Sequence, residues 1–168
     1  PTTIGHLALV VLVACRFIYY TSHPVSMCGI HATISVNDAA GLSGNLRQSL
    51  IDRGPDHLGV AERQLPHTTL VFTSTVLALR GDHVAQQPFE DAQSGSVFCW
   101  NGEAWKLDGH RVKGNDGEAV FNRLVHTQDT EPASRKNHVL SVLRSIQGPF
   151  AFLYFDAPGQ CLYLGRDR

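Results

Sequence analysis

One cysteine in this chain stands where it could act as a nucleophile. Cys28 follows Met27, the only methionine, so initiation at Met27 and removal of that methionine would leave Cys28 as the first residue. An N-terminal cysteine offers a thiol and an α-amine, and an unperturbed α-amine with a pKa of about 7.7–8.0 accepts protons near neutral pH. Such a residue needs no separate histidine as a base. Taken alone, Cys28 is also explained as a small buried hydrophobic residue, which is the commoner use of a cysteine beside a strand.

Several polar residues stand beside glycines, where the backbone allows a close approach to a ligand. They are Arg80, Asn101 with Gly102 and Glu103, and Asp116. Each also has a structural explanation. An Asn-Gly pair is typical of a hairpin turn, an Asp before a helix is typical of an N-cap, and an arginine next to glycine is often only a surface charge.

The composition indicates one globular domain. The chain has 168 residues, 43% of them hydrophobic, and a formal net charge of -1, which favours neither nucleic acid nor an anionic membrane as a partner. Its four cysteines form no C-x-x-C pair and its nine histidines form no H-x-x-x-H pair, so no metal site is expected. These features predict a soluble cytoplasmic domain with reduced thiols.

The first residues differ from the rest. An apolar run covers 7–15, and Arg16 interrupts the longer apolar stretch that ends at Tyr20. That stretch is shorter than the roughly 20 residues that span a bilayer. A secretory signal needs an apolar region of only about 7–15 residues, but no basic residue precedes this one. We expect residues 1–27 to be a leader, or a segment translated upstream of the true start, outside the fold of a domain at 28–168.

Periodicity beyond Cys28 predicts paired strands and paired helices. The pattern predicts strands at 30–36, within 70–79 as one or two strands, and at 97–100, a hairpin of 150–155 with 161–165, and helices at 42–51, 118–127 and 139–146, the second capped by Asp116. There is no regular alternation of strand and helix. The expected fold class is therefore α+β in layers, and a doubly wound parallel sheet is disfavoured.

The order of short motifs resembles a known family. The chain reads Met-Cys-Gly-Ile at 27–30, Arg-Gly-Pro-Asp at 53–56, Leu-Arg-Gly at 79–81, Trp-Asn-Gly-Glu at 100–103, Asn-Asp-Gly-Glu at 115–118, Gly-Pro-Phe-Ala-Phe at 148–152 and Gly-Arg-Asp at 165–167. This resembles the class II, N-terminal nucleophile, glutamine amidotransferase domain of asparagine synthetases, most of all in the asparagine synthetase domain-containing branch. The resemblance covers 28–168 and implies a layered αββα sandwich of antiparallel sheets flanked by helices.

The resemblance also implies roles for particular residues. Cys28 would attack the carboxamide of L-glutamine, release ammonia and form a thioester. The Asn101 side chain and the Gly102 N–H would stabilise the oxyanion, and loss of one such donor typically costs a factor of about 100–1,000 in rate.

The remaining roles concern the two charged ends of the amino acid. By resemblance, Arg80 would bind the α-carboxylate and Asp116 the α-ammonium, with Glu103 in the same pocket. The motifs at 53–56 and 166–167 would position loops around the site without contacting the substrate.

The resemblance implies an ammonia-accepting partner. The family's C-terminal synthetase domain would use ATP and magnesium, whereas no cofactor is expected in this domain. Residues ahead of Cys28 would block its amine, so the unprocessed chain is expected to be inactive. A non-catalytic glutamine-binding or scaffold domain is therefore the alternative, and a secreted or anchored module with oxidised cysteines is a third reading.

Overall fold

The computed structural model describes residues 8–13, 28–36, 42–79, 82–127 and 131–167. These residues form three helices and ten strands. The helices are α1 (Gly44–Ile51), α2 (Asp116–Val125) and α3 (Pro132–Ser145). The strands are β1 (Ala8–Val13), β2 (Gly29–Ser35), β3 (His57–Leu65), β4 (Thr68–Val76), β5 (Phe89–Glu90), β6 (Val97–Gly102), β7 (Lys106–Leu107), β8 (His110–Arg111), β9 (Phe150–Asp156) and β10 (Cys161–Arg166).

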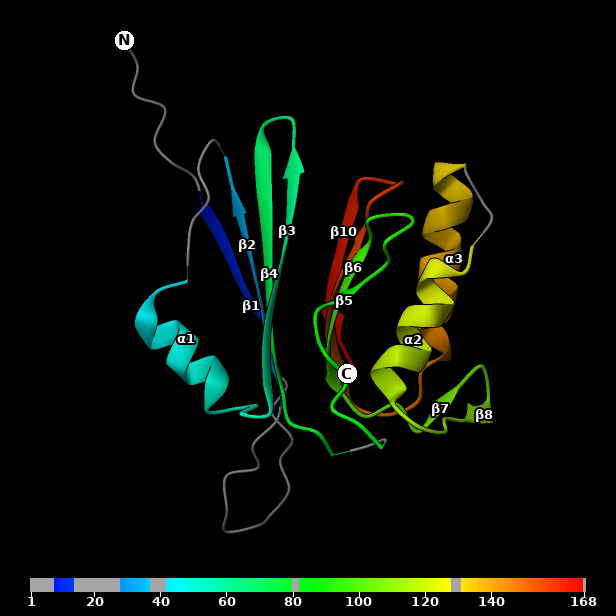
Figure 1. The fold of residues 1–168 in the computed structure, drawn as a ribbon. Helices are drawn as coiled ribbons and strands as arrows, with labels where there is room; N and C mark the ends of the chain where they lie inside the picture. Colours follow the sequence, from blue (N-terminus) through cyan, green and yellow to red (C-terminus); the bar gives the residue numbers. More distant parts are fainter. Residues whose placement is uncertain (1–7, 14–27, 37–41, 80–81, 128–130, 168) are drawn as a thin grey trace.

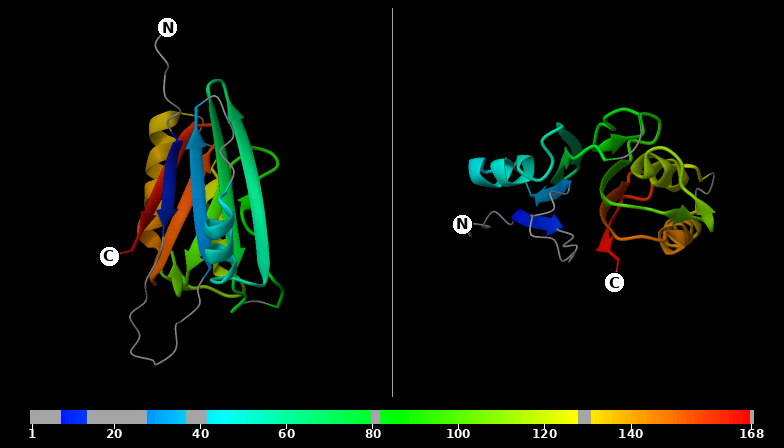
Figure 2. Two further views of the ribbon diagram at one scale, coloured as in Figure 1. Left: turned by 90° about the vertical axis from the view of Figure 1, so that its left-hand side faces the viewer. Right: turned by 90° about the horizontal axis from the view of Figure 1, so that it is seen from below.

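Two four-stranded sheets form the middle of the molecule. Their strand orders are β1-β2-β4-β3 and β10-β9-β6-β5, and every pairing is antiparallel. Helix α1 lies outside the first sheet, while α2 and α3 cover the outer face of the second (Figures 1 and 2). The layers therefore follow the order αββα, which confirms the predicted layered α+β fold.

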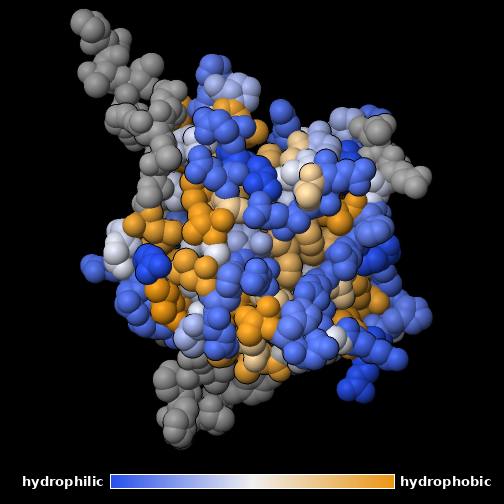
Figure 3. All heavy atoms as spheres, in the orientation of Figure 1, coloured by the Kyte–Doolittle hydropathy of each residue, from blue (hydrophilic) through white to orange (hydrophobic). Residues whose placement is uncertain are grey.

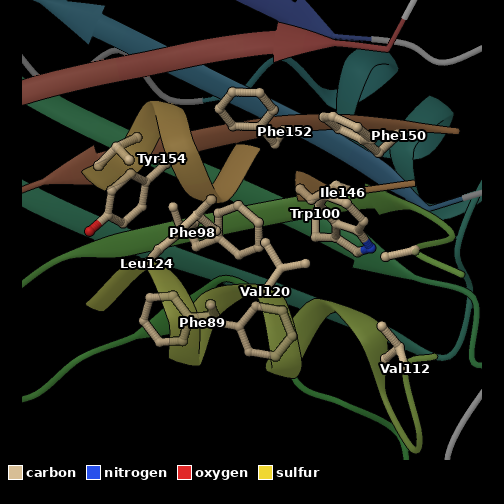
Figure 4. Packing of buried hydrophobic residues seen from close by; sticks show 14 of the residues in the cluster. Phe89, Phe98, Trp100, Val112, Val120, Leu124, Ile146, Phe150, Phe152 and Tyr154 are labelled. Atoms are coloured by element: carbon tan, nitrogen blue, oxygen red, sulfur yellow. The ribbon is translucent and has the colours of Figure 1, made fainter. Parts of the chain in front are cut away.

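Alternating residues of the central strands face two separate cores. Ile30 of β2 and Cys99 of β6 lie in the core between the sheets, while Phe98 and Trp100 point to the opposite side and pack under α2 and α3. Figure 4 shows this second core, in which aromatic rings from β5, β6 and β9 lie together. Because both faces of β6 are buried, its side chains are held from both sides.

The predicted helices are present with different ends. The helix expected at 118–127 begins at Asp116, and the one expected at 139–146 extends back to Pro132. Asp116 does not cap α2, so that prediction was wrong. Asn115 is the N-cap, with its side-chain oxygen accepting a hydrogen bond from the Glu118 N–H at 3.0 Å. The extended backbone of Asn115 allows this contact, whereas Asp116 already belongs to the first turn.

Several strands differ from the predictions, among them the short strands β5, β7 and β8, which were not predicted. Strand β3 was not predicted, since Gly59 and the polar residues of its exposed face weaken the apolar pattern. The apolar segment at 70–79 contributes to one strand, β4, which pairs with β2 and β3. Asn101 and Gly102 end strand β6 and form no hairpin turn. The hairpin of β9 with β10 is confirmed.

Part of the expected leader belongs to the first sheet. The backbone of β1, within the apolar run, pairs with β2 from Val13 opposite Ile30 to Ala8 opposite Ser35. In this structure Ala8–Val13 adds an edge strand to the first sheet, whereas residues 1–27 were expected to lie outside the fold. An apolar, β-branched segment pairs readily with an open sheet edge.

Hydrophobic and hydrophilic side chains both lie on the surface. The face in Figure 3 carries groups of hydrophobic residues among hydrophilic ones. Within the described ranges, no helix combines the length and the hydropathy that crossing a bilayer requires.

Candidate active site

One end of the sandwich collects the ends of four elements. The first residue of β2, the last residues of β4 and β6 and the first turn of α2 all lie at the lower end in Figure 1. Strands β2 and β4 face β6 across the core, and α2 contacts β6. Segments far apart in the sequence therefore meet there.

The end of β4 holds the cysteine. The Leu77 N–H donates a hydrogen bond to Cys28 Sγ at 3.3 Å. Next along the chain, the Gly29 N–H donates to Thr75 Oγ1 at 3.0 Å, and this hydroxyl donates to the Leu50 carbonyl at 2.6 Å. A Cβ on Gly29 would lie 2.7 Å from Thr75 Oγ1. Glycine after the cysteine is thus required for this close packing.

The turn after α1 fixes the same strand end. Arg53 Nε donates to the Cys28 carbonyl at 3.4 Å, and Asp56 Oδ2 accepts from the Ala78 N–H at 2.8 Å. A Cβ on Gly54 would lie 2.7 Å from the Val76 backbone. The Arg-Gly-Pro-Asp motif therefore positions the backbone on both sides of the thiol.

The surroundings of Cys28 favour the protonated thiol. Burial is the main cause that raises its pKa above the ordinary cysteine value, and the charge of Asp116 adds to it. The hydrogen bond from Leu77 and the charge of Arg53 act in the opposite direction. The net shift is upward, so formation of the thiolate requires a base or a change of local charge.

Asn101 has an unused amide within the core between the sheets. It lies two residues after Cys99, on the same face of β6, and is 1% exposed. Within the described part of the chain, neither Oδ1 nor Nδ2 has a hydrogen-bond partner. Leaving a buried polar group without a partner costs roughly 1–3 kcal/mol, so this amide is a candidate ligand-binding group.

Gly102 follows at the point where β6 leaves the sheet. A Cβ at this position would lie 2.6 Å from Phe150 Cβ and 2.7 Å from the Pro149 carbonyl. Packing against β9 therefore requires glycine here, independently of any ligand.

Asp116 is a buried carboxylate at the start of α2, only 4% exposed. Its Oδ2 accepts hydrogen bonds from Trp100 Nε1 at 3.1 Å and from the Ala104 N–H at 2.7 Å. Among the described residues, no hydrogen bond reaches Oδ1. A negative charge at a helix N-terminus is also stabilised by the helix dipole.

The other two predicted site residues are placed differently. Glu103 is exposed, and its carboxylate accepts a hydrogen bond from Trp105 Nε1 at 3.3 Å. Arg80 lies outside the described residues. Beyond it, His83 contacts Glu118 of α2 at 2.9 Å and Asp82 at 2.7 Å, and these two carboxylates raise the pKa of His83.

The titratable side chains form no evident metal centre. In the part of the chain that the structure describes, no group of three or more His, Cys, Asp or Glu residues is placed to hold an ion. The described cysteines Cys28, Cys99 and Cys161 are free thiols. Burial raises the pKa of Cys99 to about 12, which makes it unreactive at neutral pH.

Sequence analysis did not find the groups that hold Cys28 and Asp116 in place. Trp100 was noted only as a part of a motif, and its indole N–H contact was not foreseen. The backbone N–H groups of Leu77 and Ala104 contribute no side chain, so no residue type could have indicated them. Only the position of Trp100 beside Asn101 offered a signal.

Comparison with known proteins identifies the family. A family model described as glutamine amidotransferase domain matches residues 27–168. Asparagine synthetase domain-containing protein 1 of Bos taurus is 32% identical over 145 residues and that of Homo sapiens 31% over 145, each alignment covering 84% of this chain and 21% of the relative. Amidase chyE of Penicillium rubens is 33% identical over 121 residues, or 69% of this chain and 16% of the relative.

The chain spans about a fifth of the length of the two asparagine synthetase domain-containing relatives. The family match covers the elements from β2 to β10 and every predicted site residue. The chain belongs to the glutamine amidotransferase domain family, in the form found in asparagine synthetase-like proteins.

Proposed function

We propose that this domain hydrolyses L-glutamine to glutamate and ammonia, with Cys28 as the nucleophile. The observation that supports the proposal is that the elements beside three candidate groups have their ends at the same end of the sandwich. These groups are the Cys28 thiol, the unpartnered Asn101 amide and the buried Asp116 carboxylate, whose charge acts on Cys28. Family membership supports this assignment.

The substrate has two charged groups besides its carboxamide. Asp116 offers an oxygen with no donor among the described residues, which suits the α-ammonium. Arg80 suits the α-carboxylate, because a guanidinium can bond both oxygens at once. Glu103 is assigned to the rim of the pocket, in keeping with its exposed side chain.

The reaction begins when the free α-amine of Cys28 accepts the thiol proton. Sγ attacks the carboxamide carbon, a C–S bond forms, and the negative charge moves to the carbonyl oxygen. The Nδ2 group of Asn101 and the N–H of Gly102 donate hydrogen bonds to this oxyanion. The C–N bond then breaks, and the nitrogen leaves as ammonia with the proton that the amine held.

Water completes the cycle. The amine removes a proton from water, which attacks the thioester carbon, and the C–S bond breaks. Glutamate leaves, and the thiol recovers its proton. No metal or redox cofactor takes part in this balance.

The ammonia is proposed to reach an asparagine-synthetase-like domain C-terminal to this one, where ATP and magnesium would be used. The names of the two relatives from Bos taurus and Homo sapiens support such a partner domain. Further support comes from Leu79, Val84 and Trp105, three exposed large hydrophobic residues in segments that flank the site.

The test uses the full chain with a protease recognition sequence ending at position 27, so that cleavage leaves Cys28 first. Glutamate and ammonia release are measured before and after cleavage. Cleavage is expected to start turnover, because it frees the amine. A cleaved Cys28→Ser variant is the matched control and is expected to be inactive.

A binding-only domain predicts a different result. Cleaved protein that binds glutamine but neither turns it over nor reacts at Cys28 with 6-diazo-5-oxo-L-norleucine would replace the hydrolase proposal with the scaffold alternative. Intact-mass measurement reports the covalent adduct directly.

A further inference from the structure

The indole of Trp100 bonds directly to the carboxylate that the proposed function assigns to the substrate ammonium. Its Nε1 donates to Asp116 Oδ2 at 3.1 Å, and the Ala104 N–H donates to the same oxygen at 2.7 Å. Two donors on one oxygen restrict rotation of the carboxylate about its last bond. A carboxylate has about four acceptor positions, so Oδ1 retains capacity for a cationic ligand.

Trp100 is held firmly enough to direct this bond. Its ring stacks on Phe150, with centroids 5.3 Å apart and planes within 15°. Its backbone N–H donates to the buried Gln87 side chain at 2.7 Å. In Figure 4 the indole nitrogen lies on the side of the ring away from Phe98, at the edge of the aromatic cluster. The ring thus packs in the hydrophobic core, while its N–H donates a hydrogen bond to the Asp116 carboxylate of the candidate site.

The start of α2 is shaped to receive the indole. A Cβ on Gly117 would lie 3.1 Å from Trp100 Cδ1, the ring atom next to Nε1. Glycine after Asp116 therefore allows the ring to approach the first turn closely. The first turn of α2 and the indole of Trp100 therefore pack closely beside the Asp116 carboxylate.

We propose that Trp100 is a positioning residue that orients Asp116 and thereby makes the site selective for substrates with a free α-ammonium. This inference rests on the proposed function, since it assumes that Asp116 meets the ammonium of glutamine. Loss of the indole N–H is expected to leave Oδ2 one donor short and to allow the carboxylate to turn from its binding orientation.

The test isolates one N–H group. The chain has two tryptophans, so in a Trp105→Phe parent Trp100 is the only one. Growth of a tryptophan auxotroph with β-(3-benzothienyl)alanine then replaces the indole N–H by sulfur with nearly the same ring shape. The protease-cleavable full chain is used for both proteins, and circular dichroism compares their folding.

The two substrates are glutamine and glutaramic acid, which is glutamine without its α-amino group. A hydrogen bond to a charged group contributes about 1.5–3 kcal/mol, so the substituted protein is expected to lose about 10-fold to 100-fold in kcat/KM for glutamine. The loss should lie in KM. With glutaramic acid, kcat/KM should change less than about threefold, because no ammonium is present.

The outcomes separate the two proposals. If the parent protein has no glutaminase activity, or prefers glutamine no more than glutaramic acid, the proposed function or the role of Asp116 is wrong. If the parent prefers glutamine and the substituted protein keeps the same preference, only the role of Trp100 is wrong. Equal losses with both substrates would show a purely structural role for the indole and would also overturn the inference.

Discussion

At Cys28, burial and the charge of Asp116 oppose formation of the thiolate, while Arg53 favours it. The balance has a functional meaning under the proposed mechanism. An ammonium group bound at Asp116 would offset its negative charge, so arrival of the correct substrate would lower the pKa of the thiol that attacks it. Charge on the substrate and reactivity of the nucleophile are thereby linked.

The first prediction concerns this thiol. Asp116→Asn removes a negative charge and is expected to lower the pKa of Cys28, so that iodoacetamide modifies Cys28 faster at pH 8 than in the parent chain. Arg53→Gln removes a positive charge and should slow the reaction. Peptide mass spectrometry of timed samples measures both rates.

Asp108→Asn is the matched control, because Asp108 pairs with Arg123 on the surface. It should leave the rate at Cys28 unchanged. Slower modification in Asp116→Asn than in the parent would contradict the assigned electrostatics.

The second prediction separates function from stability at Asn101. Asn101→Ala is expected to lower kcat about 100-fold to 1,000-fold, by loss of an oxyanion donor. Its free energy of unfolding should change by less than about 1 kcal/mol, because the amide has no hydrogen bond to lose. Asn115→Ala, the same change at the N-cap of α2, should cost about 1 kcal/mol. Steady-state kinetics and urea unfolding give the two readouts, and an equally large loss of stability in Asn101→Ala would refute the assignment.

At the scale of elements, the turn between α1 and β3, residues 53–56, holds the end of β4 in place and is here called the clamp. Its backbone and side-chain contacts reach Val76, Ala78 and Cys28, three positions around the thiol. A helix stop such as Gly54-Pro55 thus has a second use. Besides ending α1, it fixes the backbone on both sides of Cys28 Sγ.

The third prediction tests this clamp. A Cβ added by Gly54→Ala would meet backbone atoms of Thr75 and Val76 at 2.7 Å, and backbone cannot move aside cheaply. The variant is expected to lose about 1–3 kcal/mol of unfolding free energy. The rate at which iodoacetamide modifies its Cys28 is expected to differ from the rate in the parent chain. Gly44→Ala has open space around its Cβ and should be neutral or stabilising by less than about 1 kcal/mol. Similar urea midpoints for the two variants would argue against the clamp.

At the scale of the whole molecule, the contact between the sheets brings β2, which follows Cys28, opposite β6, which contains Asn101. Phe72 of β4 and Phe155 of β9 stack across the core between the sheets, with centroids 6.3 Å apart. Neither residue has a role in the proposed reaction. Their packing nonetheless helps to fix the position of the first sheet, which follows Cys28, relative to the second sheet, which contains Asn101.

The fourth prediction follows from that packing. Phe155→Ala is expected to cost about 3–5 kcal/mol of unfolding free energy, as for other large aromatic deletions in cores, and to unfold both sheets in one transition. Leu164→Ala, on the exposed side of neighbouring β10, should change stability by less than about 0.5 kcal/mol. Urea unfolding followed by circular dichroism and by tryptophan fluorescence measures both, and separate transitions for the two signals would contradict a shared core.

Prediction from sequence succeeded where the signal was local. The alternation around Ile30 indicated β2, and the apolar spacing around Val120 indicated α2. It failed at β3, because the polar residues on the exposed face of this strand weaken the apolar pattern. It also failed at the N-cap of α2, because Asn115 and Asp116 are equally suitable N-cap residues by type. The pairing of Ala8–Val13 with β2 could not be predicted either, since a strand at a sheet edge is recognised only through its neighbour.

The sequence by itself determined the layered α+β class, the candidate nucleophile Cys28 and the order of motifs that indicates the family, because these depend on residue types and short spacings. Tertiary structure alone decided that Leu77 bonds the thiol, that Asn101 keeps its amide free and that Trp100 holds Asp116. These contacts depend on strand register and on the packing of two sheets against each other. Both are set by long-range complementarity that no short segment of the chain contains.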